Sequence, residues 1–489
     1  MVRMPRYRML LSGAAGAALV VAAFLLQRSL SRPFRPDVLV IVVDTLRADR
    51  LGSYGGPRPT SPNLDALARE SVLFEETNVS SPRTWSSFSS ILTGLYPPRH
   101  GVRFIYDDPL PASVPNLASI LRAHGYQTTA FDPIAFVRDM TGGKAFDVHF
   151  DSDAVGHWVQ DHDITETVGR WLVRPFERPR LAFVRLQGPH WPYRNRPEDL
   201  PALGAPDCRH LDHSFLSMGH GDGLDFKGPG KGFAVSDPAA YRRLMFDVDR
   251  RPEVLEHRMV HYDAAIRTTD AYIGRLLETL RTSGRLDKTL VVVTSDHGES
   301  VGEHGYLQHG PRVDFSVMRV PLLIRFPARL PHGHAGQRVS QLVRSVDVLP
   351  TILDTLGLPA PDALDGVSLL PAVRGEDLRL TCYAESEREF AGVDPELALP
   401  GNAGKQRMVR TLRWKLLYRH DGQRPLYRLF DLAADPSERH DVGAEHPKEL
   451  AMLRDLLDRF MRLDAGDSDG QGELTPEQKE QLRALGYIN

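Results

Sequence analysis

Hydrophobic and polar positions along the chain predict an alternation of buried strands with amphipathic helices. Apolar, β-branched runs indicate strands at 38–43, 126–131, 181–186, 289–294 and 320–325. Apolar residues recur three and four positions apart over 63–74, 85–92, 114–126 and 259–283, which predicts helices there. Strands that alternate with helices favour an α/β fold built on a parallel sheet.

The pattern changes after residue 373. Short alternating runs predict the strands of a small antiparallel sheet, and an amphipathic helix is expected at 448–463; the strands fall at 382–385, 408–412, 415–418 and 425–431. We therefore expect a catalytic domain at 37–373 and an α+β subdomain with a tail at 374–489.

Two stretches of the expected catalytic domain lack clear periodicity. Residues 132–150 have a loop-like composition, and residues 194–258 are rich in Pro, Gly and His. A long irregular stretch in a compact domain is typical of a functional loop. We interpret 194–258 as a lid insertion that helps to select the substrate.

The N-terminus has the pattern of a membrane-targeting segment. An uncharged run at 9–26 is flanked by arginines, including Arg8 and Arg28. Eighteen such residues reach the lower limit for a spanning helix, and no small-residue cleavage site follows. We expect residues 1–36 to be a signal anchor with the catalytic domain exported, periplasmic or extracellular. A cleaved signal peptide and a buried helix are the alternatives.

Composition and charge limit the kinds of partner that this protein is expected to bind. The 489 residues carry a net charge of −3 and no basic stripe, which argues against a nucleic-acid partner. The two cysteines, Cys208 and Cys382, make no disulfide framework, and whether they pair stays open. Nothing in the sequence indicates an oligomeric state.

Chemistry-bearing residues follow two of the predicted strands. Asp44 ends the first strand, and Asp296 and His297 follow the strand at 289–294. Carboxyl ends of parallel strands meet at one edge of a sheet, where ligands bind. Carboxylates with an imidazole suit one Mn²⁺ or Zn²⁺ ion, and an all-oxygen set would suit Ca²⁺ or Mg²⁺. The alternative is that each aspartate only caps the next turn.

Thr84 begins the short helix at 85–92, where backbone N–H groups favour an anionic group. A hydroxyl bound to a divalent cation has a lowered pKa and can attack phosphorus or sulfur. Thr84 is therefore both a candidate nucleophile and a further metal ligand. An N-cap threonine is the alternative interpretation.

Several motifs resemble those of the sulfatases, within the alkaline phosphatase superfamily. They read DVLVIVVDTLRADRLGSYG, TSPNLD, ILTGLYPPRHGV, GPHWPY and SDHGE, and the resemblance extends over nearly all of the chain from Asp37. It implies an α/β/α sandwich and an enzyme acting on an anionic sulfate or phosphate ester. It also implies active-site roles for His190, in the PHxPY turn, and for His309, where sulfatases often carry a basic residue. Each could protonate a leaving group or bind an ester oxygen.

The chain departs from the sulfatase pattern at the nucleophile. Sulfatases modify a Cys or Ser in a C/S-x-P-x-R frame to formylglycine, but residues 84–88 read TWSSF here. Thr45 replaces the family's second aspartate, and His297 replaces its asparagine. Similar Asp, Thr and Asp-His sets occur in the lipoteichoic acid synthases and phosphoethanolamine transferases of the superfamily, which use Mn²⁺ or Zn²⁺.

Three hypotheses follow from these residues. Threonine cannot release sulfate by collapsing to an aldehyde as formylglycine does, so phosphoester hydrolysis or phosphotransfer is favoured on chemical grounds. Family resemblance alone favours a sulfuric ester hydrolase. A catalytically silent binding protein on the same fold is the third hypothesis.

Overall fold

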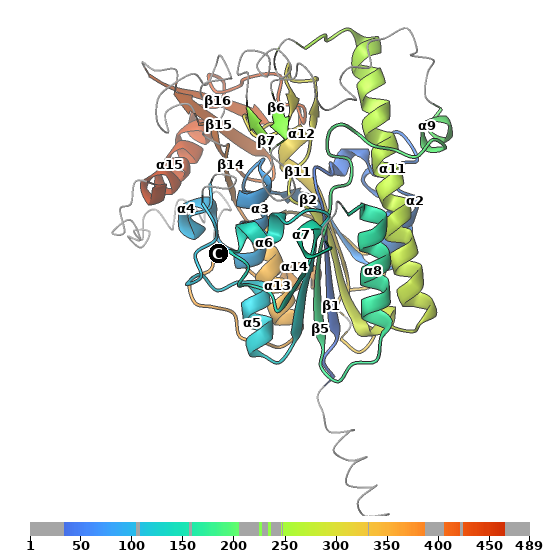
Figure 1. Cartoon of the computed structure of the whole chain (residues 1–489). Helices are drawn as coiled ribbons and strands as arrows, with labels where there is room; N and C mark the ends of the chain where they lie inside the picture. The colour runs from blue at the N-terminus through green and yellow to red at the C-terminus, as the bar shows by residue number, and fades with distance from the viewer. Residues whose placement is uncertain are drawn as a thin grey trace, which may run out of the picture. The chain divides into compact units, whose positions relative to one another are not determined.

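The protein is built on a large sheet that is covered by helices on both faces (Figure 1). The computed structural model describes residues 34–103, 108–155, 159–204, 224–226, 233–235, 246, 248–330, 332–386, 405–420 and 424–464. The chain separates into two units, residues 1–36 and 37–489. The elements below all belong to the second unit.

Eight strands of the described chain form the large sheet. Their spatial order is β12 (Arg338–Arg344), β2 (Val72–Asn78), β11 (Arg319–Arg325), β8 (Thr289–Ser295), β1 (Asp37–Val43), β5 (Arg180–Leu186), β3 (Gln127–Phe131) and β4 (Val148–Phe150). β11 pairs antiparallel with both β8 and β2, whereas the other pairings are parallel. The sheet is therefore mostly parallel, which confirms the predicted fold class.

β1 lies in the middle of this sheet and is buried on both faces. Val38, Val40 and Val42 pack into one hydrophobic core, and Leu39 and Ile41 pack into the other. A continuous apolar run is expected of such a strand, because both of its faces are covered. Its carboxyl end is consequently the point where the chain leaves the centre of the molecule.

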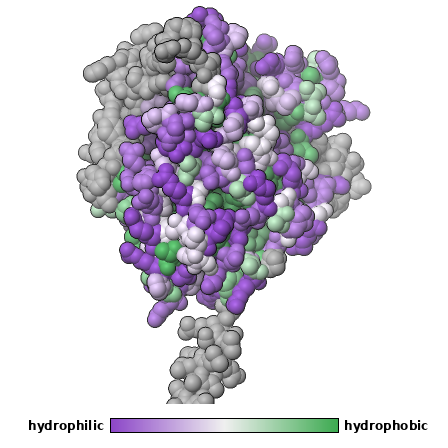
Figure 2. Space-filling view, turned by 90° about the vertical axis from the view of Figure 1, so that its right-hand side faces the viewer, coloured by the Kyte–Doolittle hydropathy of each residue, from purple (hydrophilic) through white to green (hydrophobic). Residues whose placement is uncertain are grey.

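Each core is closed by a layer of helices. The layer on the right of Figure 1 contains α2 (Pro62–Ala68), α8 (Asp161–Val173) and α11 (Pro252–Thr282); the other contains α3 (Thr84–Thr93), α5 (Leu117–Ala123), α6 (Phe136–Met140), α13 (Val348–Thr355) and α14 (Leu370–Val373). The face turned to the viewer in Figure 2 is mostly hydrophilic. The sheet and its two helix layers form the α/β/α sandwich that the resemblance implied.

The predicted helix at 63–74 was wrong in its second half. Helix α2 ends at Ala68, and Val72 begins strand β2, which pairs with β11 and β12. The apolar residues of 72–74 match a helical period by chance. Pairing with two strands buries them more completely than the end of a short surface helix would.

Two other expectations need correction. Residues 132–150 are more than a loop, because they contain helix α6 and edge strand β4. The helix expected over 114–126 is shorter, since Asn116 caps α5 by accepting a hydrogen bond from Ser119 N at 3.0 Å. Capping fixes its first turn three residues later than the apolar spacing indicated.

The C-terminal part forms the predicted antiparallel sheet. Its order is β13 (Cys382–Glu385), β14 (Arg407–Arg410), β15 (Trp414–His420) and β16 (Pro425–Asp431), and it is packed by α15 (Pro447–Asp464). The Phe460 ring of α15 stacks on Tyr383 at 4.5 Å and meets Tyr96 at 5.4 Å. Tyr96 follows α3, so this packing connects the subdomain to the helix that begins at Thr84.

Parts of the expected lid and anchor lie outside the described residues. Within 194–258 the structure gives α9 (Asp199–Ala202), β6 (Leu224–Phe226), β7 (Phe233–Val235) and the start of α11. Cys208 and most of the expected anchor, residues 1–33, also lie outside them, whereas Cys382 is a buried free thiol. Among the helices in the described ranges, none is long and apolar enough to cross a bilayer.

Candidate active site

Asp44 and Asp296 lie side by side at the carboxyl ends of two neighbouring strands. β1 and β8 pair in parallel with Val43 opposite Ser295, so the next residue of each strand reaches the same edge. Both carboxylates are fully buried. Asp296 Oδ1 accepts hydrogen bonds from Thr45 N at 3.2 Å and His297 N at 2.9 Å, which fixes the carboxylate against both strand ends.

His297 presents one ring nitrogen to these carboxylates. Its Nε2 lies 3.4 Å from Asp296 Oδ2 and 3.8 Å from Asp44 Oδ1. Its Nδ1 lies 3.0 Å from the Gly298 carbonyl, so Nδ1 carries the proton and donates it to that oxygen. The Nε2 lone pair therefore faces two carboxylate oxygens.

Thr84 is the first residue of α3 and completes the group. Its Oγ1 lies 3.3 Å from His297 Nε2, and its side chain is buried. Arg83, not Thr84, occupies the N-cap position, so the alternative N-cap interpretation of Thr84 is wrong. Ser87, one turn later, donates a hydrogen bond from Oγ to the Asp296 carbonyl and ties the helix to β8.

Burial and charge set opposite protonation tendencies for the two carboxyls. Burial would raise the pKa of Asp44, but the nearby Arg185, His190 and His297 outweigh it and lower that pKa. For Asp296, burial and the Asp44 charge together raise the pKa well above its usual range. Burial lowers the pKa of His297 to about 4, so its ring is neutral at pH 7.

These donors fit a divalent cation. Asp44, Asp296 and His297 offer ligand atoms within 4.8 Å of one another. Asp44 Oδ1 and Asp296 Oδ2 are buried, and neither has a hydrogen-bond partner in the described structure. Carboxylate oxygens this close repel one another, which is why the Asp44 charge raises the pKa of Asp296, and a cation among them would relieve that repulsion. The three residues thus form a possible Asp/His metal site.

His190 and His309 lie beside this group. The rings of His309 and His297 are 4.3 Å apart, and those of His309 and His190 are 5.0 Å apart. Burial, with the neighbouring His297 and His190, lowers the pKa of His309 well below its usual value. The structure therefore brings together every site residue expected from the sequence.

Sequence reasoning missed the residues that support the site. Glu299 is buried with Oε2 3.4 Å from His309 Nδ1. Asp161 accepts hydrogen bonds from Gln187 N at 2.8 Å and Gly188 N at 2.7 Å, and so holds the turn that carries His190. Arg185 pairs with Asp44. Of these residues, only Arg185 could have been found from the sequence, because it is a charged residue inside an apolar strand.

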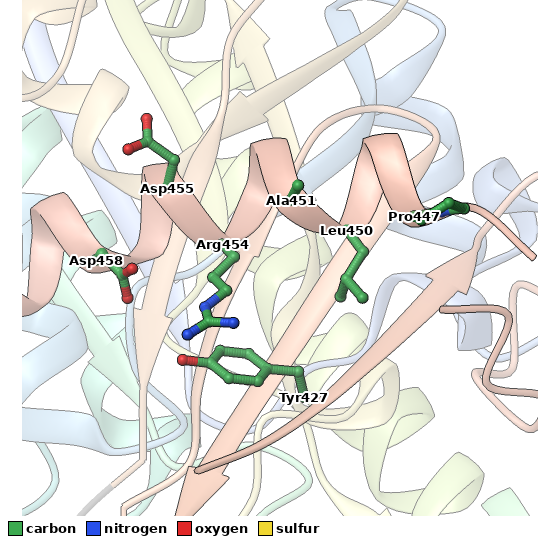
Figure 3. Close-up of a pocket in the computed structure, with 7 residues that line it drawn as sticks. All are labelled: Tyr427, Pro447, Leu450, Ala451, Arg454, Asp455 and Asp458. Carbon is green, nitrogen blue, oxygen red and sulfur yellow. The ribbon is translucent and has the colours of Figure 1, made fainter. Parts of the chain in front are cut away.

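Pockets elsewhere on the molecule do not contain these residues. One of about 300 Å³ lies between α15 and β16, where Arg454 covers the Tyr427 ring at 4.7 Å (Figure 3). Another, of about 460 Å³, is lined by Trp85 and by residues near α6. The second adjoins the start of α3, whereas the first is lined by α15 and by Tyr427 of β16.

Comparison with known proteins shows the family to which the chain is similar. The sulfatase family profile matches residues 36–358, and the profile of the N-sulphoglucosamine sulphohydrolase C-terminal region matches 302–465. An ulvan-active sulfatase from Formosa agariphila is 25% identical over 462 residues, covering 87% of this chain and 80% of the relative. A multifunctional alkaline phosphatase superfamily protein from Trinickia caryophylli is 27% identical over 511 residues, covering 87% and 95%.

A solved structure shows the same fold. The phosphonate monoester hydrolase of Agrobacterium radiobacter superposes with a TM-score of 0.64 at 24% identity, covering 91% of this chain and 99% of that one. The family profile accounts for well over half of the 489 residues. The chain therefore belongs to the sulfatase family, the ester hydrolases of the alkaline phosphatase superfamily.

Proposed function

We propose that this enzyme hydrolyses or transfers phosphate-type esters with Thr84 as its nucleophile. The observation that carries the proposal is the position of Thr84 Oγ1, 3.3 Å from His297 Nε2 at the N-terminus of α3. Backbone N–H groups at that end of a helix favour the anionic ester. A hydroxyl at this point is in position to attack the phosphorus atom of an ester bound there.

Four atoms would hold a divalent cation: Asp44 Oδ1, Asp296 Oδ2, His297 Nε2 and Thr84 Oγ1. The imidazole favours Mn²⁺ or Zn²⁺ over Ca²⁺ or Mg²⁺. When bound, such a cation supplies positive charge that polarises the ester and lowers the pKa of a hydroxyl beside it.

The remaining steps use the chain's own groups. The Thr84 hydroxyl gives its proton to solvent, and Oγ1 forms a bond to phosphorus while the bond from phosphorus to the leaving oxygen breaks. We assign the proton for that oxygen to His190, which lies beside His309, and a hydrogen bond to a non-bridging oxygen to the neutral ring of His309, which lies beside His297. Water or an acceptor alcohol then loses a proton and attacks the phosphothreonine at phosphorus. The bond from phosphorus to Thr84 Oγ1 breaks, and Oγ1 takes up a proton again.

Threonine favours phosphoryl over sulfuryl transfer. Residues 84–88 lack the frame in which sulfatases make formylglycine, so a sulfated Thr84 would have to be cleaved at sulfur. Sulfuric ester hydrolysis is the second candidate, supported by relatives such as the ulvan-active sulfatase. A phosphothreonine needs no aldehyde for its release, which is why we place phosphate-type esters first.

The test is adduct mapping with matched threonine variants. The full chain, supplied with Zn²⁺ or Mn²⁺, is exposed briefly to an aryl phosphate, an aryl phosphonate monoester or an aryl sulfate, then digested for peptide mass spectrometry. We expect a phosphoryl or phosphonyl adduct on Thr84. Thr84→Ala should lose at least about 10³-fold in turnover, while Thr84→Ser retains measurable activity.

Thr93→Ala is the control, because Thr93 ends the same helix, and its hydroxyl donates to the Ser89 carbonyl at 2.7 Å and accepts from Leu95 N at 3.3 Å. This variant should keep parental turnover. Turnover of the sulfate ester alone, with Thr84 required, would replace the phosphoryl assignment by the sulfuryl one. Parental rates in Thr84→Ala would refute the role of Thr84 for either ester.

Export and substrate selection are separate proposals. The arginine-flanked apolar run at 9–26 supports a membrane anchor with the enzyme on the outer side. We also propose that 194–258 shapes the substrate site, and that the subdomain boundary lies near residue 373.

A further inference from the structure

Arg185 is a buried cation at the end of an otherwise apolar strand. It is the penultimate residue of β5, which pairs in parallel with β1, and its side chain is 3% exposed. Its Nη2 donates to Asp44 Oδ2 at 2.5 Å, and its Nη1 donates to Asp132 Oδ1 at 3.0 Å. The guanidinium thus bridges a carboxylate of the site and one outside it.

Asp132 is itself held in place. It follows β3, and its carboxylate accepts hydrogen bonds from Ile134 N at 3.2 Å and Val137 N at 2.8 Å, at the start of α6. The Phe136 ring of α6 lies 4.9 Å from Arg185 Cζ. The Arg185 head group is therefore fixed by two carboxylates and an aromatic face.

This arrangement gives the two oxygens of Asp44 different partners. Oδ2 is occupied by Arg185, whereas Oδ1 lies 3.8 Å from His297 Nε2 and has no hydrogen-bond partner among the described residues. A carboxylate held in this way can offer only one oxygen to a cation. The orientation of the Asp44 carboxylate is therefore set by Arg185 of β5 and not by the backbone of β1.

We propose that Arg185 is a positioning residue of the cation centre, holding Asp44 so that Oδ1 alone faces His297 and Asp296. This inference rests on the cation centre of the proposed function. Lysine could not do the same, because its single ammonium cannot reproduce the planar fork that reaches both carboxylates. Loss of such an outer partner typically costs about 10–100-fold in metal affinity or activity.

The same pair of strands provides a matched control at its other end. Arg180 begins β5 and Asp37 begins β1, and Arg180 Nη2 lies 3.0 Å from Asp37 Oδ2. Arg180 is as deeply buried as Arg185. Its pair with Asp37 lies at the opposite end of the strands from Asp296 and His297. Arg180 also donates to the carbonyls of Trp171, Leu172 and Arg174, so its loss is at least as disruptive to the fold.

The experiment measures metal affinity without using activity. The double variant Arg185→Met with Asp132→Asn removes the charges of Arg185 and of its partner outside the site. The double variant Arg180→Met with Asp37→Asn removes the ion pair at the opposite end of the two strands. Each full-length chain is freed of metal and checked for folding by circular dichroism. The dissociation constant for Zn²⁺ is then measured by competition with a chromophoric chelator.

We expect the dissociation constant to rise about 10–100-fold in the first double variant and to match the parent in the second. Equal constants in all three proteins, equal losses in both double variants, or a parent that binds no Zn²⁺ would each overturn the inference. If the first double variant does not fold, Arg185→Lys is judged by the same criterion. A selective loss of affinity in a protein without ester turnover would uphold Arg185 and refute the proposed function.

Discussion

Gly188 lies where the turn carrying His190 crosses the end of β1, and its substitution probes that contact. Gly188 has φ +52°, and a Cβ built there would lie 2.6 Å from Val43 Cγ1 and 3.5 Å from the Asp44 carbonyl oxygen. Its N–H donates to Asp161 Oδ2 at 2.7 Å. The turn therefore cannot move away from β1 without breaking that hydrogen bond.

The cost of Gly188→Ala has two parts. A non-glycine residue in the left-handed region costs about 1–2 kcal/mol. Forcing a methyl group into a packed contact costs about 1–3 kcal/mol more. We expect the free energy of unfolding to fall by about 2–5 kcal/mol, and turnover to fall as well, because His190 and Asp44 are both displaced.

Gly284→Ala carries only the first part, so the difference between the two variants gives the second. Gly284 follows α11 with φ +65°, and a Cβ there would meet no atom within 4 Å. This control should lose only about 1–2 kcal/mol and keep parental turnover. Urea unfolding and ester turnover measured on both variants decide the question. Equal destabilisation with equal turnover would show that the turn does not depend on its contact with β1.

Two further predictions concern charge. Burial would raise the pKa of Glu385, but Lys405 and Arg103 outweigh it and lower that pKa to about 2. The carboxylate should therefore stabilise the fold by about 3 kcal/mol above pH ~4.3 and lose this as pH falls towards 2. Urea unfolding across that range should show a weaker acid dependence in Glu385→Gln; an unchanged dependence would contradict the assignment. Chelator dialysis should abolish ester turnover, with Zn²⁺ or Mn²⁺ restoring it; full turnover by metal-free protein would refute the cation centre.

The position of the site could be predicted because each strand that carries it has a continuous apolar run. Such runs mark both Asp44 and Asp296 as strand-end residues, and parallel pairing of β1 with β8 brings them together. The helix at 63–74 could not be resolved from its neighbour, since Val72 and Leu73 satisfy a helical and a strand pattern equally. Only pairing with β11 and β12 decides that segment.

The supporting contacts could not be predicted, because they join segments that are distant in sequence and leave no local pattern. Asp161 begins a helix and would be expected to cap it, yet its carboxylate binds the turn after β5. Ser87 would be expected to form a hydrogen bond within its own helix, yet its hydroxyl donates to the Asp296 carbonyl.

These two contacts do what the sequence motif alone cannot. One fixes the turn of His190, and the other fixes α3 against β8, so that Thr84 and His297 stay 3.3 Å apart. The sequence motifs identify the reacting groups. The hydrogen bonds between distant segments set the distances between those groups, on which the reaction depends.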